Sequence, residues 1–284
     1  MTTGKTYSDF VNRLKSVYDE READNIADWV FEKITGLKRS ERRLDKDEEL
    51  DESDFLLLQN YLQQLLQHKP VQYVLEEAWF YKMKFFVNEN VLIPRPETEE
   101  LVEWIVNDLK SEAVSKSTNI IDIGTGSGCI AISLKKELTK AKVTAIDTSE
   151  KALEVAKKNS LELNAKTDFI QLDFLKEEKW NRLSKFDVIV SNPPYIPVRE
   201  RESLAKNVTE HEPAMALFVE NNDPYIFYKK IARFSETHLE PNGKVYVEVH
   251  EDYAKEVKTL FENTRFKSEI KKDIYGKERM VKAF

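Results

Sequence analysis

Cysteine and histidine are scarce in this chain. Among 284 residues there are one cysteine and four histidines. The lone cysteine, Cys129, cannot form an internal disulfide or a cysteine-rich metal site, which agrees with a reducing compartment. The histidines are scattered along the sequence and do not supply the clustered ligands of a zinc site. We therefore expect a protein that binds no metal.

The sequence also lacks long apolar runs and an excess of positive charge. No stretch approaches the roughly 20 apolar residues that a membrane-spanning helix requires. The first residues contain no apolar segment typical of a secretion signal, so we expect a cytoplasmic protein without a membrane partner. The net charge is −7 at pH 7. This charge argues against a surface that binds nucleic acid directly and favours a protein or small-molecule substrate.

The first part of the chain has the pattern of amphipathic helices, and the total length suggests about two domains. Two helices are predicted between Tyr7 and Gly36, a short one is possible in the charged segment that follows, and another runs from Ser53 to Pro70. We predict a small helical domain over residues 1–75. A structural cap and a partner-docking module both explain such stripes.

Residues 76–93 have the composition of a linking β-hairpin. Aromatic and β-branched residues gather in the runs 80–87 and 91–93, which are separated by a polar turn at 88–90. A helix then begins near Pro96, because proline suits the first helical turn. Arg95 stands between two prolines, where it is either a solvated side chain or one held toward a fixed partner.

From Ser117 onward, short apolar strands alternate with helices. Strands are predicted at 119–123, 143–146, 169–172, 188–190 and 244–249, followed by two closing strands near Phe266 and Met280. This alternation predicts an α/β domain over residues 94–284, with a mostly parallel sheet covered by helices on both faces. The last two strands can pair antiparallel.

A glycine-rich loop follows the first of these strands. The segment Gly124–Gly128 reads G-x-G-x-G, which departs from the dinucleotide-binding motif and from the phosphate-binding P-loop. Asp147 ends the second strand, where a carboxylate can accept both ribose hydroxyls of an adenosine. Asp173 ends the third strand, and the aromatic Phe174 follows it. Together these residues predict an adenosine ligand without a pyrophosphate.

The fourth strand ends in the segment Ser191-Asn192-Pro193-Pro194-Tyr195. Two successive prolines fix their own backbone and push Asn192 towards an extended conformation. A rigid loop therefore separates an amide, which both donates and accepts hydrogen bonds, from an aromatic ring. Such a loop suits a planar polar substrate group, although a plain strand-ending turn has the same composition.

Together, Asp122, the glycine loop, Asp147, Asp173 and Asn192–Tyr195 resemble the S-adenosylmethionine-dependent methyltransferases that modify an amide or amine nitrogen. Further segments resemble the HemK/PrmC family, which methylates the side-chain nitrogen of the glutamine in the Gly-Gly-Gln motif of class I peptide chain release factors. These segments are 70–74, 93–99, 212–217 and 273–279. The resemblance implies a Rossmann-like class I methyltransferase fold with a seven-stranded sheet, and we expect it to act as a monomer on release factors.

The resemblance also assigns roles to single residues. The cofactor-binding set is Asp122, Gly124, Thr125, Gly126, Ser127, Gly128, Asp147, Asp173, Phe174 and Asn192. The catalytic set is Asn192, Pro193, Pro194 and Tyr195, and the substrate-binding set adds Arg95 to these four. Asn192 Oδ1 and the Pro193 carbonyl are the expected acceptors for the substrate amide, Tyr195 is expected to stack on it, and no general base is assigned.

The chain departs from the family pattern in three places. A glutamate, Glu76 or Glu77, replaces a glycine after the segment 70–74, and Phe174 stands where tryptophan is frequent. After the fifth strand, the expected Glu-His-Gly reads Glu248-Val249-His250, which leaves that edge of the pocket undefined. Three alternatives remain: methylation of a ribosomal-protein glutamine, amino methylation of DNA on a flipped base, and a scaffold without turnover.

Overall fold

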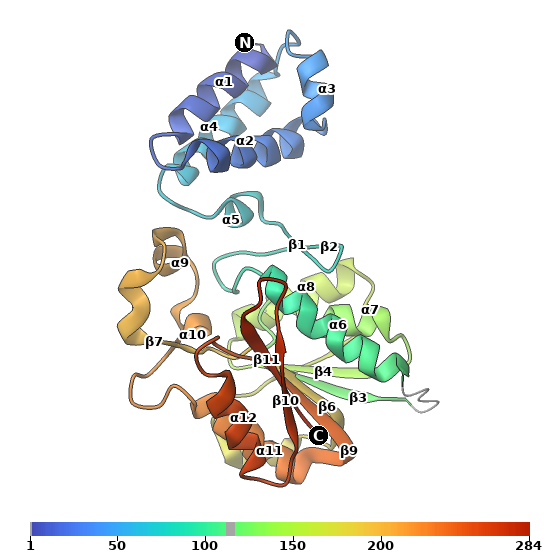
Figure 1. Cartoon of the computed structure of the whole chain (residues 1–284). Helices are drawn as coiled ribbons and strands as arrows, with labels where there is room; N and C mark the ends of the chain where they lie inside the picture. The colour runs from blue at the N-terminus through green and yellow to red at the C-terminus, as the bar shows by residue number, and fades with distance from the viewer. Residues whose placement is uncertain (1, 112–116) are drawn as a thin grey trace. The chain divides into compact units, whose positions relative to one another are not determined.

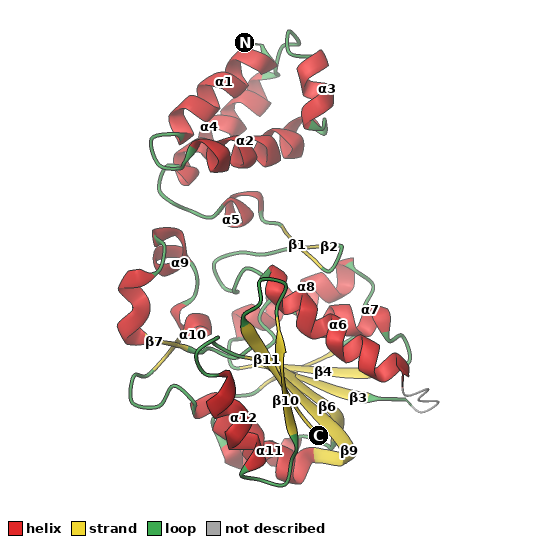
Figure 2. Cartoon of the chain, in the orientation of Figure 1, coloured by secondary structure: helices red, strands yellow, loops and turns green. Residues whose placement is uncertain are grey.

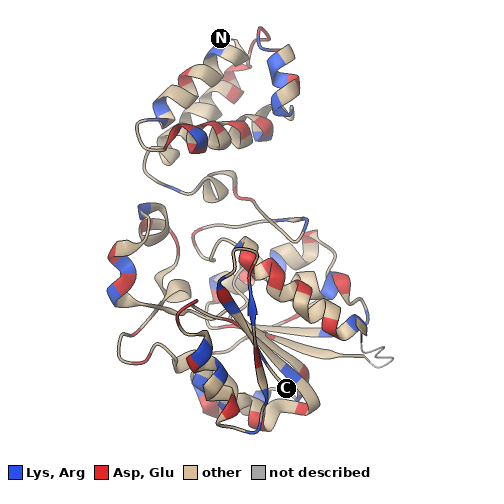
Figure 3. Ribbon diagram, in the orientation of Figure 1, with Lys and Arg blue, Asp and Glu red and all other residues tan. Residues whose placement is uncertain are grey.

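The computed structural model describes residues 2–111 and 117–284 (Figures 1 and 2). Contacts between residues divide the chain into two compact units. One comprises Met1–Glu76 together with Ala205–His211, and the other comprises Glu77–Leu204 and Glu212–Phe284. In the described part of the chain, no helix has the length and apolar character needed to cross a membrane. Figure 3 shows basic and acidic residues interspersed along the helices of both units.

The first unit is entirely helical. Its helices are α1 (Thr3–Leu14), α2 (Glu20–Thr35), α3 (Arg39–Leu44), α4 (Glu52–Leu65), α5 (Val71–Leu75) and, from later in the chain, α9 (Lys206–His211). The carboxylate of Asp19 caps α2 by accepting the Glu22 N–H at 2.8 Å, and Gly36 ends that helix with a φ of 70°. Much of the apolar stripes seen in the sequence forms the core, with Phe10, Leu14 and Val30 buried, whereas Trp29 and Leu57 are exposed.

The second unit is built on a seven-stranded sheet. Its strands are β3 (Asn119–Ile123), β4 (Lys142–Asp147), β5 (Asp168–Gln171), β6 (Phe186–Ser191), β9 (Leu239–Glu248), β10 (Ser268–Lys272) and β11 (Glu278–Ala283). They follow the order β10-β11-β9-β6-β3-β4-β5. Strands β5, β4, β3, β6 and β9 are parallel, whereas β11 and β10 pair antiparallel. The Rossmann-like sheet predicted from the sequence is confirmed.

Helices cover both faces of this sheet, because its central strands are apolar on both sides. The helices are α6 (Pro96–Ser111), α7 (Cys129–Glu137), α8 (Glu150–Glu162), α11 (Ile226–His238) and α12 (Ala254–Glu262). Alternate residues of one strand enter different cores: Ile120 packs with α6 and α7, whereas Ile121 packs with α11 and α12. The segment between β6 and α11 contains short elements that the sequence pattern did not predict. They are β7 (Ile196–Pro197), η2 (Val198–Ser203), α10 (Ala214–Leu217) and β8 (Phe218–Val219), while η1 (Glu177–Arg182) precedes β6.

The linking hairpin is shorter than the sequence suggested. It pairs β1 (Ala78–Phe80) with β2 (Met83–Phe85) through a turn in which Tyr81 and Lys82 both have positive φ. The prediction of a strand at 91–93 was wrong, because no strand forms there. A side chain takes the place of a partner strand: Glu212 Oε2 accepts the Ile93 N–H at 3.2 Å. Residues 240–243 form an irregularity inside β9, which pairs with β6 on both sides of it.

Candidate active site

The largest set of sequence-predicted residues meets in a cavity of about 760 Å³ at the carboxyl ends of β3, β4 and β6. Ligands of open α/β sheets bind at this edge, because the loops that follow the strands diverge there. The predicted residues that line the cavity are Gly124, Gly126, Asp147, Asp173, Phe174, Asn192, Pro193 and Pro194. The remaining lining comes mainly from residues 90–92 and from the segment 213–227.

Backbone geometry explains the glycines of the loop after β3. Gly124, Gly126 and Gly128 have φ values of 75°, 54° and 82°, in the left-handed region that favours glycine. A Cβ atom on Gly124 or Gly126 would meet no atom within 4 Å, so a ligand can approach the backbone closely there. At Gly128 a Cβ would lie 3.1 Å from Ala156 Cβ, so that glycine serves the packing of α7 against α8.

Asp147 holds the loop and faces the cavity. Its Oδ2 accepts the Gly126 N–H and its Oδ1 accepts the Ser149 N–H, both at 2.9 Å. Burial raises the pKa of Asp147, and these two hydrogen bonds oppose the rise because they favour the charged form. Each oxygen retains a further lone pair for a hydroxyl group.

Asp173 and Phe174 form the neighbouring wall of the cavity. Asp173 Oδ1 accepts the Leu175 N–H at 3.2 Å, which turns the chain after β5. Phe174 is buried and stacks on Trp180 with ring centroids 5.3 Å apart, so its position is fixed by core packing. The wall therefore combines a carboxylate with a rigid aromatic surface.

Four other predicted residues, Asp122, Thr125, Ser127 and Gly128, do not line the cavity. The first three are buried, and Thr125 Oγ1 donates a hydrogen bond to Asp122 Oδ2 at 2.7 Å. Burial raises the pKa of Asp122 to about 7. These residues hold the glycine loop in place from the side that faces away from the cavity.

On the opposite side, Asn192 is tied to a buried network. Asn192 Nδ2 donates to Thr98 Oγ1 at 3.1 Å, and Thr98 Oγ1 donates to Glu248 Oε2 at 2.6 Å. Tyr195 does not line the cavity; its hydroxyl donates to Glu248 Oε1 at 3.3 Å and its ring lies edge-on to His250. Glu248 is thus the common acceptor of the network, and burial raises its pKa to about 7.

Arg95 has a partner of the opposite charge. Its Nη2 lies 2.6 Å from Oε1 of Glu212, whose side chain is 1% exposed. The other oxygen of Glu212 accepts the Ile93 N–H. The pair joins the segments that precede α6 and α10, two segments that also supply cavity-lining residues, Leu92 and Pro213 among them.

No role for Thr98, Glu248 or Glu212 follows from the sequence alone. Each lies in a segment that takes part in the comparison with the HemK/PrmC pattern, and this pattern is the sequence signal that could have pointed to them. Their partners lie 94, 150 and 117 residues away in the pairs Asn192–Thr98, Thr98–Glu248 and Arg95–Glu212. Only the folded chain shows which side chains meet.

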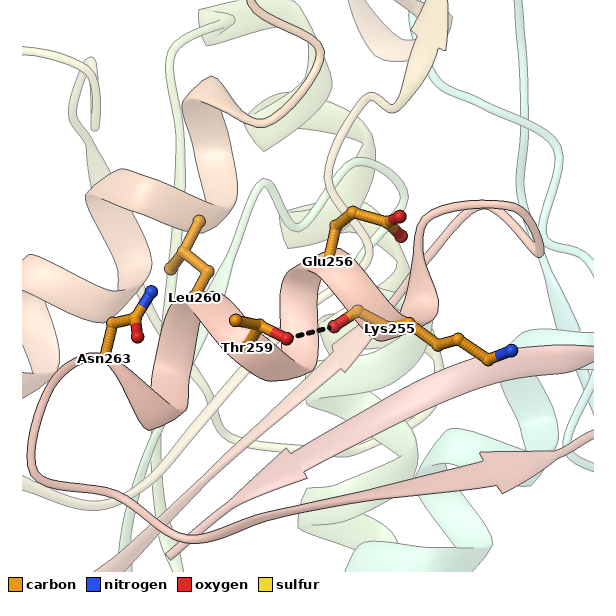
Figure 4. A pocket seen from close by; sticks show the side chains of 5 residues that line it. All are labelled: Lys255, Glu256, Thr259, Leu260 and Asn263. Carbon is orange, nitrogen blue, oxygen red and sulfur yellow. Dashed lines mark hydrogen bonds between the residues drawn. The ribbon is translucent and has the colours of Figure 1, made fainter.

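A second hollow lies on the outer surface of α12 and differs in kind (Figure 4). It is lined by Lys255, Glu256, Thr259, Leu260 and Asn263. Its one drawn hydrogen bond, from Thr259 Oγ1 to the Lys255 carbonyl at 2.9 Å, is an ordinary bond within a helix. Within residues 2–111 and 117–284, no cluster of three or more potential ligands forms a metal site.

Comparison with known families and proteins agrees with this geometry. Residues 99–215 match the methyltransferase small domain, and residues 6–75 match the PrmC N-terminal domain. A methyltransferase from Pyrococcus furiosus has a similar fold, with a TM-score of 0.51 and 20% identity, over 79% of this chain and 98% of that chain.

Two curated relatives are similar over almost the whole chain. The release factor glutamine methyltransferase of Flavobacterium psychrophilum is 46% identical over 96% of this chain and 95% of that protein. The protein of the same name from Bacteroides thetaiotaomicron is 37% identical, over 95% of both chains. Such identity over this length exceeds what a shared fold alone produces. The chain belongs to the family of release factor glutamine methyltransferases, the HemK/PrmC family.

Proposed function

We propose that this enzyme transfers a methyl group to the side-chain amide nitrogen of the glutamine in the Gly-Gly-Gln motif of class I peptide chain release factors. The observation that carries the proposal is the position of Asn192. Its carboxamide lines the cavity with its Nδ2 already engaged by Thr98. Its Oδ1 is then the natural acceptor for an incoming amide N–H.

S-adenosylmethionine is the methyl donor of this family and fits the opposite side of the cavity. When bound, it supplies a methyl group on a positively charged sulfur and leaves as S-adenosylhomocysteine. Gly124 and Gly126 leave open space for its close approach, and the lone pairs of Asp147 suit the ribose hydroxyls. Asp173 and Phe174 suit the edge and plane of the adenine.

Alignment is the main task of the remaining residues. An amide nitrogen is a weak nucleophile because its lone pair is delocalised, so its orientation must be fixed before reaction. Asn192 Oδ1 and the Pro193 carbonyl accept the two amide hydrogens, which supports the positive charge that develops on nitrogen. One of these protons leaves to water afterwards, so the chain needs no strong base. Tyr195 acts at a distance, through its hydrogen bond to Glu248.

The helical region of residues 1–75 is assigned to docking of the release factor. The segment 76–93 serves as the linker and residues 94–284 as the catalytic domain. Support comes from the match of residues 6–75 to the PrmC N-terminal domain and from the names of the two curated relatives. We place the enzyme in the cytoplasm, where release factors act, as a monomer without direct contact to nucleic acid.

Mass spectrometry of tryptic peptides tests the proposal. Purified enzyme and labelled S-adenosylmethionine are incubated in parallel with unmodified release factor, ribosomal protein and DNA. One methyl on the glutamine of Gly-Gly-Gln is expected, and a release factor with that glutamine changed to alanine should take no label. Label only on ribosomal protein or DNA would overturn the substrate assignment. Cofactor binding without any label would favour a scaffold.

A further inference from the structure

Two buried side chains and one that reaches the cavity form a continuous hydrogen-bonded chain. Glu248 ends β9, Thr98 lies in the first turn of α6, and Asn192 follows β6. Thr98 and Glu248 are both 2% exposed. The chain runs from Asn192 Nδ2 to Thr98 Oγ1 at 3.1 Å and from Thr98 Oγ1 to Glu248 Oε2 at 2.6 Å. Because water does not reach Thr98 and Glu248, breaking either bond would leave a buried polar group without a partner and would cost free energy.

The threonine hydroxyl gives this chain a direction. A hydroxyl has one proton, and a carboxylate can only accept. When Thr98 donates to ionised Glu248, only its lone pairs are left for Asn192, so the amide must present Nδ2 to Thr98. Its Oδ1 then points the other way. If the direction reversed, Nδ2 would point away from Thr98 and would meet the N–H groups of a substrate amide, donor against donor.

Several groups surround the Glu248 carboxyl and bias its charge. Burial is the largest effect and raises the pKa of Glu248 to about 7, Arg279 on β11 and the bonds from Thr98 and Tyr195 lower it, and Glu97 on α6 raises it. Tyr228 on α11 donates to the backbone carbonyl of Glu248 at 3.0 Å. Cys129 on α7 is close enough for the charge of Glu248 to raise the pKa of its thiol. The direction of the hydrogen-bonded chain is therefore open to change near neutral pH.

We propose that Thr98 and Glu248 are positioning residues that set the rotation of the Asn192 carboxamide. With Glu248 ionised, Oδ1 of Asn192 is presented to the substrate amide. With Glu248 protonated, its O–H donates to Thr98, the threonine hydroxyl can donate to Asn192 Oδ1, and the amide rotates to its unproductive orientation. This inference rests on the proposed function, because it explains how Asn192 is kept ready as an acceptor.

Substitutions at Thr98 separate the hydroxyl from the packing. Thr98→Val has nearly the same shape but cannot take part in the hydrogen-bonded chain, whereas Thr98→Ser keeps the hydroxyl. We expect Thr98→Val to lower kcat by roughly 10- to 100-fold, as for the loss of a hydrogen bond to a charged group. Thr98→Ser should stay within about threefold, and both should bind S-adenosylmethionine like the unsubstituted enzyme. Equal activity of Thr98→Val and the unsubstituted enzyme would overturn the proposal.

The dependence of kcat on pH gives a readout that packing alone would not change. The unsubstituted enzyme should lose activity as the pH falls below about 7, because Glu248 becomes protonated. Glu248→Gln can accept from Thr98 through its amide oxygen and donate to Tyr195 at every pH. Because this variant has no carboxyl to titrate there, the activity that it retains should show no acidic decline, and Thr98→Val should lose the decline as well. An acidic decline that persists in both variants would contradict the inference.

A third measurement needs no turnover and so separates this inference from the proposed function. The side-chain NH₂ signals of Asn192 in asparagine-labelled enzyme, assigned by their absence in Asn192→Ala, should shift with pH near 7. The shift should vanish in Thr98→Val. If the signals do not titrate, the inference fails even when the enzyme methylates release factor. If they titrate as expected but release factor takes no label, the substrate assignment fails and the inference stands.

Discussion

The two sides of the cavity are built in different ways. The side that we assign to the cofactor consists of backbone groups and of residues close in sequence, such as Gly126, whose N–H bonds to Asp147 only 21 residues later. The reaction side depends on side chains from distant segments, since Asn192 and Thr98 are 94 residues apart and Thr98 and Glu248 are 150 apart. Binding can thus rest on a local loop, whereas orientation of the reacting group needs the assembled sheet.

This comparison predicts that Asn192→Ala affects turnover far more than cofactor binding. Loss of a preorganised polar group at a reacting centre typically costs about 10²- to 10³-fold in kcat, while the affinity for S-adenosylmethionine should change by less than about threefold. Steady-state kinetics with release factor and calorimetry of cofactor binding measure the two quantities. Asn222→Ala, at an exposed lining residue of the same cavity, is the control and should be nearly silent. Equal losses in kcat and affinity would erase the distinction between the two sides.

On the reaction side, ionisation of the buried Glu248 should lower the free energy of unfolding as the pH rises. The pKa of Glu248 is raised from 4.5 to about 7, so the folded state binds its proton more tightly than the unfolded state does. Between these values the folded state holds more protons, and the free energy of unfolding falls by about 3 kcal/mol as the pH rises through the window. Glu248→Gln lacks this contribution. Urea unfolding measures the free energy of unfolding of both proteins at pH 4.5, 6 and 7.5. The unsubstituted enzyme should lose stability relative to Glu248→Gln as the pH rises. The same pH dependence in both proteins would show that folding does not raise the pKa of this carboxyl.

The cofactor side has its own structural anchor, and its loss should affect stability. Asn159 is fully buried, accepts the Phe86 N–H at 2.7 Å and donates to the carbonyls of Phe86 and Ser127 at 2.9 Å. Asn159→Ala leaves these groups without partners, which should cost about 2–3 kcal/mol in the free energy of unfolding. Asn263→Ala, at an exposed position after α12, should cost less than about 0.5 kcal/mol. Similar small costs for both would mean that the loop does not depend on this anchor.

The smallest expected effect concerns the glycine loop itself. Gly126→Ala puts a side chain at a φ of 54°, which costs about 1–2 kcal/mol of stability. With the cofactor bound against this backbone, as we propose, the added methyl group would crowd it, so the affinity for S-adenosylmethionine should fall roughly tenfold by isothermal titration, equivalent to about 1.4 kcal/mol. Gly276→Ala is the matched control, since Gly276 has a φ of 81°, open space and no place in the cavity. An equal loss of affinity in both variants would attribute the effect to strain alone.

Prediction from sequence succeeded where the determining interactions are local. The apolar strand Asn119–Ile123 has the predicted bounds, and the predicted glycine loop, Asp147, Asp173 and Asn192 all meet at one edge of the sheet. It failed for the strand at 91–93, because the backbone there is held by the Glu212 side chain, which lies far away in sequence. A pattern of apolar residues cannot reveal such a partner.

The sequence by itself determined the order of helices and strands, the loop that approaches a ligand, and the family, because each depends on periodicity, on glycine conformation or on short motifs. Only the tertiary structure decided which side chains act together. In the folded chain Tyr195 lies outside the cavity lining and bonds to Glu248, Arg95 pairs with Glu212, and Thr98 lies between Asn192 and Glu248. The physical reason is that the direction of a hydrogen bond depends on two groups in space, and here those groups come from three separate segments of the chain.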